Sequence, residues 1–97
     1  MSVPTVEHPK ILIAEDEIVV ALDLEQSLTG LGYDVVGVAD TGRGAVRLVN
    51  EVRPHLVLMD IRLKGQMDGI EAAEEIRRRS QVPVVFVTAF TDRKSVV

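Results

Sequence analysis

Short unbroken runs of apolar residues alternate along the chain with stretches in which apolar residues recur every three or four positions. The unbroken runs are rich in β-branched residues and cover 11–14, 35–38, 56–59 and 82–87. Runs of this length are typical of strands that are buried on both faces, as in a parallel sheet. We therefore expect four strands, with Pro83 near the start of the last, where a missing amide donor matters least.

The stretches between these runs have the spacing of amphipathic helices, with one apolar stripe each. The stripes comprise Ala21, Leu24, Leu28 and Leu31 in the first helix, Ala45, Leu48, Val49 and Val52 in the second, and Ile70, Ala73 and Ile76 in the third. Thr41 and Asp68 precede the second and third helices, where their side-chain oxygens can accept from free amides. Gly30 and Gly32 can end the first helix, and Asp92 can open a fourth.

Regular alternation of strands and helices predicts an α/β fold, an open parallel sheet with helices on both faces. The 97 residues are enough for one small domain, and the 46% of hydrophobic residues suits a buried core. We expect residues 1–9 to be a polar tail and residues 10–97 to be the domain.

Charge and composition exclude several classes of protein. The formal net charge of −4 speaks against a nucleic-acid surface, and the lack of cysteine excludes disulfides and cysteine-based zinc sites. The start of the chain has no apolar signal segment, and no apolar run approaches the roughly 18 residues of a membrane span. A cytoplasmic protein that does not contact a membrane is the default expectation.

Acidic residues follow two of the predicted strands. Glu15, Asp16 and Glu17 come after the first run, Asp60 after the third, and Thr88 after the fourth. Ligands of open parallel sheets bind beyond the carboxyl ends of the strands, where the strand order reverses. If the first and third strands are neighbours, these acids meet at one point.

Such a group of carboxylates is suited to binding Mg²⁺. Carboxylates placed close together disfavour their own ionised forms unless a cation lies between them, and oxygen ligands without His or Cys favour Mg²⁺. Mg²⁺ keeps several waters and leaves room for a phosphate oxygen. A carboxylate can itself attack phosphorus to form an aspartyl phosphate, while a nearby hydroxyl donates to the phosphoryl oxygens. The pattern predicts a site that accepts a phosphoryl group.

Four segments, in order and spacing, resemble the receiver domain of two-component response regulators. They are 11–17 (ILIAEDE), 56–63 (LVLMDIRL), 68–71 (DGIE) and 84–89 (VVFVTA). The resemblance covers about residues 10–92 and implies a flavodoxin-like fold with strand order 2-1-3-4, the family's fifth strand being missing here. The chemotaxis regulators belong to the same family.

The resemblance also implies a role for each site residue. Asp60 resembles the aspartate that is phosphorylated. Asp16 resembles the direct Mg²⁺ ligand, Glu15 reaches the metal directly or through water, and Asp60 and the backbone carbonyl of Arg62 complete the protein ligands. Thr88 resembles the hydroxyl that moves onto the phosphoryl oxygens, and the amide of Ala89 helps to bind them. The implied phosphodonor is a sensor histidine kinase or a phosphotransfer protein.

The sequence departs from the family pattern in two places. The segment 63–68 is one residue longer than the usual loop, with Gly65 supplying flexibility. The family continues through a fourth helix, a fifth strand with a Lys-Pro and a fifth helix, whereas the sequence ends at Val97, and Lys94 does not match that lysine. We therefore expect the 84–87 run to be an exposed sheet edge and the chain to form a homo-oligomer, edge to edge or by exchanged elements.

Three other functions remain to be weighed against the phosphoacceptor. A receiver fold without the lysine can serve as a non-phosphorylated module for dimerisation or protein interaction. A metal-dependent phosphatase usually has a second acid two residues after its nucleophile, and that position is Arg62. Flavin or dinucleotide binding requires a glycine-rich loop after the first strand, which is acidic here. We expect no turnover enzyme.

Several charged residues have simpler interpretations. Glu17 favours the start of the first helix, and Asp68 is expected to be a helix cap. The run of arginines at 77–79 is typical of a solvated helix face.

Overall fold

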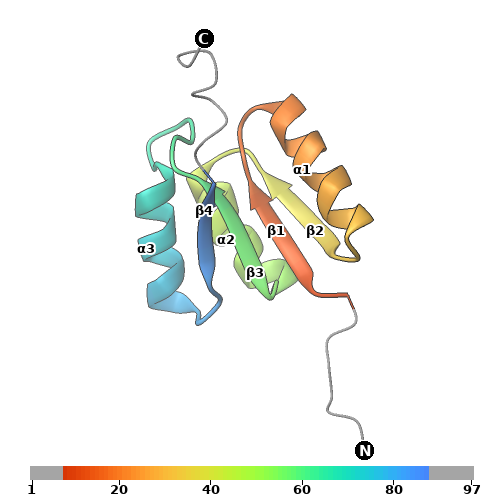
Figure 1. Ribbon diagram of the computed structural model, residues 1–97. Coiled ribbons are helices and arrows are strands. Elements are labelled where there is room, and N and C mark those ends of the chain that lie inside the picture. Colours follow the sequence, from red (N-terminus) through yellow and green to blue (C-terminus); the bar gives the residue numbers. More distant parts are fainter. Residues whose placement is uncertain (1–7, 88–97) are drawn as a thin grey trace, which may run out of the picture.

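The computed structural model describes residues 8–87, which form a four-stranded parallel sheet with three helices (Figure 1). The elements along the chain are β1 (Lys10–Ala14), α1 (Ile18–Gly30), β2 (Asp34–Ala39), α2 (Gly42–Val52), β3 (Leu56–Asp60), α3 (Gly69–Arg79) and β4 (Val84–Val87). The strand order is β2-β1-β3-β4 and every pairing is parallel. The predicted α/β fold and strand order are confirmed.

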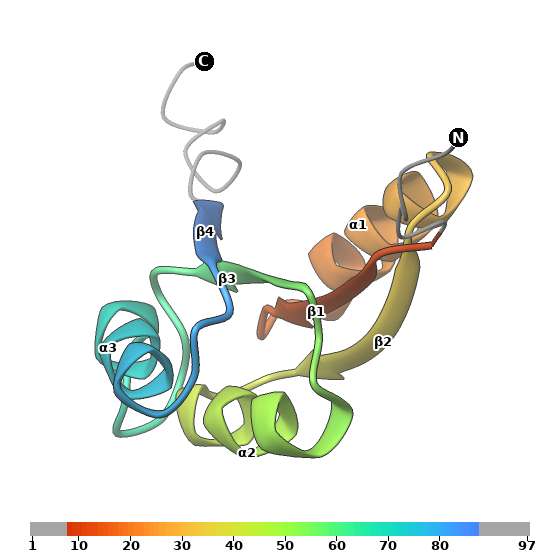
Figure 2. The same ribbon diagram turned by 90° about the horizontal axis from the view of Figure 1, so that it is seen from below.

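The helices cover both faces of the sheet, as expected. Figure 2 shows α1 on one face and α2 with α3 on the other. A buried hydrophobic cluster lies beneath α2 and α3 and includes Leu12, Val57, Met59 and Ile76. Ile11 and Ile13 are also buried, and they alternate with the clustered β1 side chains. Burial on both faces explains why β1 reads as an unbroken apolar run.

Burial on both faces was a wrong prediction for β2 and β4. Val38 of β2 is 42% exposed, and Val85 of β4 is 47% exposed. Both strands are at the ends of the strand order within residues 8–87, so each has a neighbouring strand on one side only. An apolar run therefore identified the strands without distinguishing the central ones from the outer ones.

The helix stripes need two corrections. Leu31 lies just after α1 and is 75% exposed, because the helix ends at Gly30 and the chain turns through Gly32 at a φ of 99°. Ile70 is 48% exposed, and the buried residues of α3 are instead Gly69, Ala72, Ala73 and Ile76. Small side chains let this helix approach β3 closely. A pattern of large apolar residues does not identify such small residues as buried.

The predicted helix caps are confirmed for α2 and α3. The Thr41 hydroxyl accepts a hydrogen bond from the Gly44 amide at 3.0 Å. The Asp68 carboxylate accepts from the Glu71 amide at 2.9 Å, and the Glu71 carboxylate accepts from the Asp68 amide at 3.0 Å. This reciprocal pair satisfies two amides and places the start of α3.

Three sequence predictions fall outside residues 8–87: Thr88, Ala89 and the helix opening at Asp92. The division into a tail at 1–9 and a domain at 10–97 also stays a prediction. Among the described helices, none has both the length and the apolar character that crossing a membrane requires.

Candidate functional site

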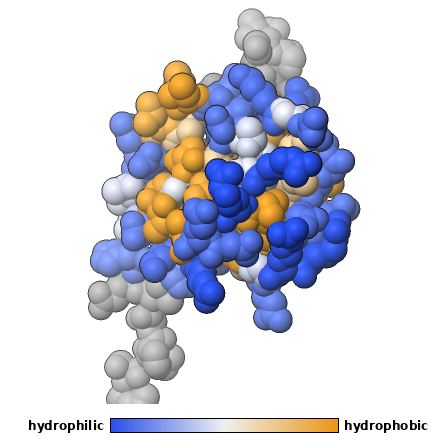
Figure 3. All heavy atoms as spheres, turned by 180° about the vertical axis from the view of Figure 1, so that it is seen from behind, coloured by the Kyte–Doolittle hydropathy of each residue, from blue (hydrophilic) through white to orange (hydrophobic). Residues whose placement is uncertain are grey.

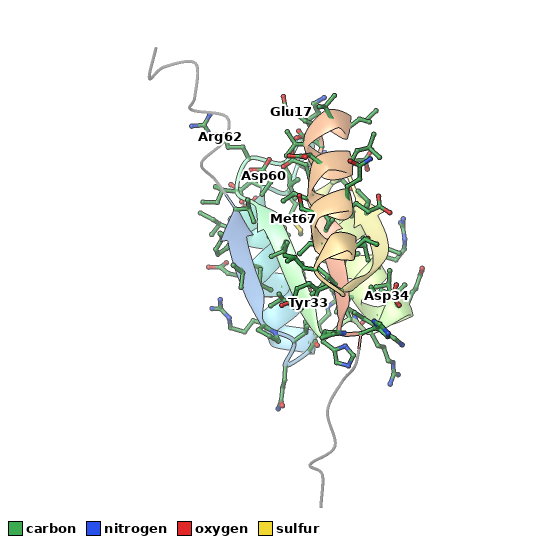
Figure 4. The ribbon with its side chains drawn as sticks, turned by 45° about the vertical axis from the view of Figure 1, so that its right-hand side comes forward. Glu17, Tyr33, Asp34, Asp60, Arg62 and Met67 are labelled. Atoms are coloured by element: carbon green, nitrogen blue, oxygen red, sulfur yellow. The ribbon has the colours of Figure 1, made fainter. Side chains whose placement is uncertain are left out.

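Three carboxylates meet at the carboxyl ends of β1 and β3. Glu15, Asp16 and Asp60 each place one oxygen within 4.8 Å of the others. Glu15 and Asp60 are 6% exposed, and Asp16 is partly buried. The adjacency of β1 and β3 in the sheet brings these distant parts of the sequence together, as the sequence predicted. In Figure 4, Asp60 and Glu17 lie at the same end of the molecule, and Tyr33 and Asp34 lie at the other.

Backbone amides orient two of the three carboxylates. The Glu17 amide donates to Glu15 Oε2 at 3.1 Å, and the Arg62 amide donates to Asp60 Oδ1 at 3.1 Å. The backbone of Glu15 is itself fixed, since its amide donates to the Ala39 carbonyl of β2 at 2.8 Å. Glu15 and Asp60 therefore each have one carboxylate oxygen held by a backbone amide of the turn that follows their strand. This hydrogen bond fixes the orientation of the carboxylate and so the direction of its second oxygen.

Burial raises the pKa of the Glu15 carboxyl from its ordinary value of 4.5 to about 7. The hydrogen bond from the Glu17 amide acts in the opposite direction, while the charge of Asp60 and hydrogen bonds with Asp16 and Asp60 raise the pKa further. Near neutral pH this group of acids therefore holds a proton that a bound cation would displace.

The donor set fits Mg²⁺. All three side chains offer hard oxygen ligands, two of them buried, and neither His nor Cys belongs to the group. Mg²⁺ takes one or two carboxylates directly and keeps several waters. With one of the three acids reaching the ion through water, positions remain for phosphate oxygens. Burial is the main cause of the raised pKa of Glu15, and the charge of Asp60 adds to it, so a cation bound between the two would favour the ionised form of Glu15.

The remaining predicted site residues are placed as follows. Arg62 follows β3 and its side chain is exposed; Figure 4 shows it pointing away from the sheet, which leaves only its backbone near the site. Thr88 and Ala89 lie outside the described residues. Val87, the last residue of β4, pairs with Asp60. Glu17 immediately precedes α1 and its side chain makes no capping hydrogen bond.

Gly69 is a site residue that the sequence analysis did not identify. A Cβ at this position would lie 2.0 Å from the Asp60 carbonyl oxygen and 2.8 Å from the Ile61 Cα. The Gly69 amide also donates to the Ile61 carbonyl at 2.8 Å. The start of α3 thus packs directly on the backbone of Asp60, an approach that only glycine permits. The Asp-Gly pair at 68–69 was the available signal, and it was interpreted as a helix cap and as part of the family resemblance, without a contact to Asp60.

The loop between β3 and α3 is tied to the start of α2. A Cβ on Gly42 would lie 2.5 Å from the Met67 carbonyl oxygen, and Lys64 forms a β-bridge with Thr41. Gly65 has a φ of 99°, which confirms the need for glycine in the longer loop.

Comparison with known proteins agrees with this geometry. The family model described as "Response regulator receiver domain" matches residues 11–97. The Phyllosphere-induced regulator PhyR of Methylorubrum extorquens is 44% identical over 87% of this chain and 32% of its own length. The transcriptional regulatory protein PdtaR of Mycobacterium tuberculosis is 43% identical over 87% of the chain and 40% of its own length. The chain thus spans less than half of either relative.

Solved receiver structures have the same fold. The receiver domain of a modulated diguanylate cyclase from Desulfovibrio desulfuricans matches with a TM-score of 0.81 and 40% identity, over 91% of this chain and 70% of that one. The receiver domain of PhyR from Erythrobacter litoralis matches with a TM-score of 0.78 and 40% identity, over 89% and 67%. With the sheet order, the acid group at its carboxyl edge and these matches, the chain belongs to the response regulator receiver domain family.

Proposed function

We propose that the chain is a phosphoacceptor of a two-component signalling system and that Asp60 takes the phosphoryl group. The observation that carries this proposal is the meeting of Glu15, Asp16 and Asp60, with oxygens within 4.8 Å, at the carboxyl ends of adjacent strands. The donor is the phosphohistidine of a sensor histidine kinase or a phosphotransfer protein. The protein is a signalling module located in the cytoplasm and not a turnover enzyme.

Asp60 is assigned as the nucleophile because its position at the end of β3 resembles that of the phosphorylated aspartate of receiver domains. The Arg62 amide donates to one of its carboxylate oxygens, and the other oxygen is left to attack phosphorus. That oxygen forms the new bond to phosphorus as the bond from phosphorus to the histidine nitrogen breaks, and the nitrogen keeps the electron pair. The product is an acyl phosphate on Asp60.

Glu15 and Asp16, with Asp60 and the backbone carbonyl of Arg62, would hold Mg²⁺. When bound, the ion neutralises charge on the transferring group and on the carboxylates. Thr88 and Ala89 would donate a hydroxyl and an amide to the phosphoryl oxygens. The register that pairs Val87 with Asp60 supports their assignment.

A second candidate function is that of a non-phosphorylated module for dimerisation. The observation in its favour is β4, which pairs only with β3 within residues 8–87 and exposes 47% of Val85 and 38% of Phe86. An apolar strand edge of this kind favours pairing with another chain. A homo-oligomer formed through β4, or by exchange of elements, is compatible with either function.

The experiment that tests the first function is labelling with acetyl phosphate. We expect the wild-type protein to gain one phosphoryl group in the presence of Mg²⁺, detected by intact-mass spectrometry. Neither Asp60→Asn nor wild-type protein in EDTA should gain it. Asp34→Asn, which removes an exposed acid at the other end of the sheet, is the matched control and should label normally. Equal labelling of Asp60→Asn and wild type would rule out the proposal.

A further inference from the structure

A groove runs between α2 and α3, on the face of the sheet opposite α1. It consists of two adjoining hollows of about 390 and 470 Å³ that share Asn50 and Arg79 in their walls. The first is also lined by Arg43 and Arg47, and the second by Arg53. We call this feature the arginine groove, after Arg43, Arg47, Arg53 and Arg79. Figure 3, which views the molecule from behind, shows strongly hydrophilic side chains gathered on this side with apolar ones between them.

The groove is basic in a chain with a formal net charge of −4. Its lining includes four arginines and a single acid, Glu75, which pairs with Arg79 at 2.7 Å within α3. The Arg47 pair with Glu51 is long, at 3.8 Å, and both side chains are more than half exposed. Within residues 8–87, neither Arg43 nor Arg53 forms an ion pair. The groove therefore presents positive charge that the described part of the chain does not neutralise.

Three of these arginines occupy positions that carry a local cost, although Arg47 also pairs with Glu51 and Arg53 lies at the end of α2 where the helix dipole favours a positive charge. Arg43 lies in the first turn of α2, where the helix dipole disfavours a positive charge, and that turn contains no acid. Arg47 is four residues further along, so the two like charges repel each other. Arg53 ends α2 at a φ of 48°, a left-handed conformation in which glycine is the least strained residue. Residues that break local preferences in this way are expected at functional surfaces.

We infer that the arginine groove binds an acidic segment of a partner polypeptide. Arginine guanidinium groups present paired donors that match a carboxylate. Arg43 and Arg53, which form no ion pair within residues 8–87, and Arg47, whose pair is long, suit several Asp or Glu side chains. Val46, Met67, Val49 and Val82 line the same hollows and provide apolar contacts between the charges. The partner segment is therefore acidic and amphipathic. None of the three acids of the proposed phosphoacceptor site lines the two hollows, so we expect binding at this groove without phosphorylation of Asp60.

The lining favours a polypeptide over a nucleic acid. Single-stranded nucleic acids are usually bound by basic grooves with aromatic side chains on which the bases stack, and none of the residues that line the two hollows is aromatic.

The test is fluorescence anisotropy of the full chain with a labelled peptide of alternating Glu and Leu. We expect saturable binding that weakens as salt is raised, because screening shortens the range of the charges. Arg43→Gln should weaken binding about two- to fivefold, as loss of one exposed ion pair does. Arg77→Gln, which removes an equal charge from a helix position outside the groove, should leave it unchanged. Asp60→Asn should bind like wild type, which separates this inference from the proposed function.

Charge reversal gives a second arm. Arg43→Glu should weaken binding of the Glu-Leu peptide more than Arg43→Gln does, and it should improve binding of a Lys-Leu peptide. Far-UV circular dichroism should show that both Arg43 variants fold. A Gln-Leu peptide that binds as well as the Glu-Leu peptide would overturn the inference, as would equal effects of Arg43→Gln and Arg77→Gln. Tighter binding of a mixed-sequence RNA would assign the groove to nucleic acid instead. Self-association lost in Arg43→Gln would assign it to a second copy of the chain.

Discussion

Replacing Gly69 with alanine tests whether the start of α3 positions the backbone of Asp60. The added Cβ would lie 2.0 Å from the Asp60 carbonyl oxygen, whereas contacts below 3.0 Å are essentially never found, so the two must separate by about 1 Å. The neighbouring atoms are backbone atoms at the end of β3 and cannot rotate away. Overpacking of this kind costs about 1–3 kcal/mol. Because about 1 kcal/mol shifts Tm by roughly 4–8 °C in a chain of this size, we expect Tm to fall by roughly 4–24 °C.

Thermal unfolding followed by circular dichroism measures the loss of stability, and acetyl phosphate labelling measures the effect on the site. Gly30→Ala is the matched control, because a Cβ there meets nothing within 4 Å and alanine is the better helix former. Gly30→Ala should keep or raise Tm and label at the wild-type rate. A Gly69→Ala protein with the Tm and labelling rate of wild type would refute the packing argument.

Of four further predictions, two concern the acid group and one each concerns the α3 cap and the sheet edge. Because the pKa of Glu15 is raised to about 7, its ionised fraction grows about tenfold between about pH 6 and pH 8. The affinity of the wild-type protein for Mg²⁺, measured by isothermal titration calorimetry, should therefore rise over that range. The affinity of Glu15→Gln should rise much less. Without Mg²⁺, the folded state keeps a proton on Glu15 that the unfolded state releases above about pH 4.5. The contribution of Glu15 to the free energy of unfolding should therefore fall as pH rises from about 4.5 to about 7. Urea titrations that show the opposite trend would contradict the raised pKa of Glu15. Asp68→Ala breaks the reciprocal cap of α3 and should cost about 0.5–2 kcal/mol in urea unfolding, whereas Asp23→Ala, on exposed α1, should cost less. Val85→Lys should reduce any association through β4, measured by multi-angle light scattering; an unchanged oligomer would place the interface elsewhere.

The order of elements was predictable from the sequence because two periodicities alternate without interruption. Unbroken apolar runs located the four strands found within residues 8–87, and the polar oxygens of Thr41 and Asp68 located two helix starts. Spacing alone did not show which strands are central. That distinction depends on strand order, which the resemblance to receiver domains supplied and the structure confirmed.

The acid group was predictable because the carboxyl ends of parallel strands share one edge of the sheet. Glu15, Asp16 and Asp60 meet there once β1 and β3 are neighbours. The close packing of Gly69 on Asp60 was not predictable, because a glycine in the sequence does not show which backbone it contacts. The arginine groove was missed for a related reason, since its members come from two helices and the run at 77–79 was interpreted by itself.

The identity of the phosphorylated residue is the central claim, and borohydride reduction tests it most directly. Borohydride converts an aspartyl phosphate to homoserine and leaves free aspartate unchanged, so peptide mass spectrometry after labelling with acetyl phosphate and Mg²⁺ locates the phosphoryl group. We predict homoserine at position 60, with unmodified acids at positions 15 and 16. Homoserine at position 16, or a labelled protein with unmodified Asp60, would contradict the account.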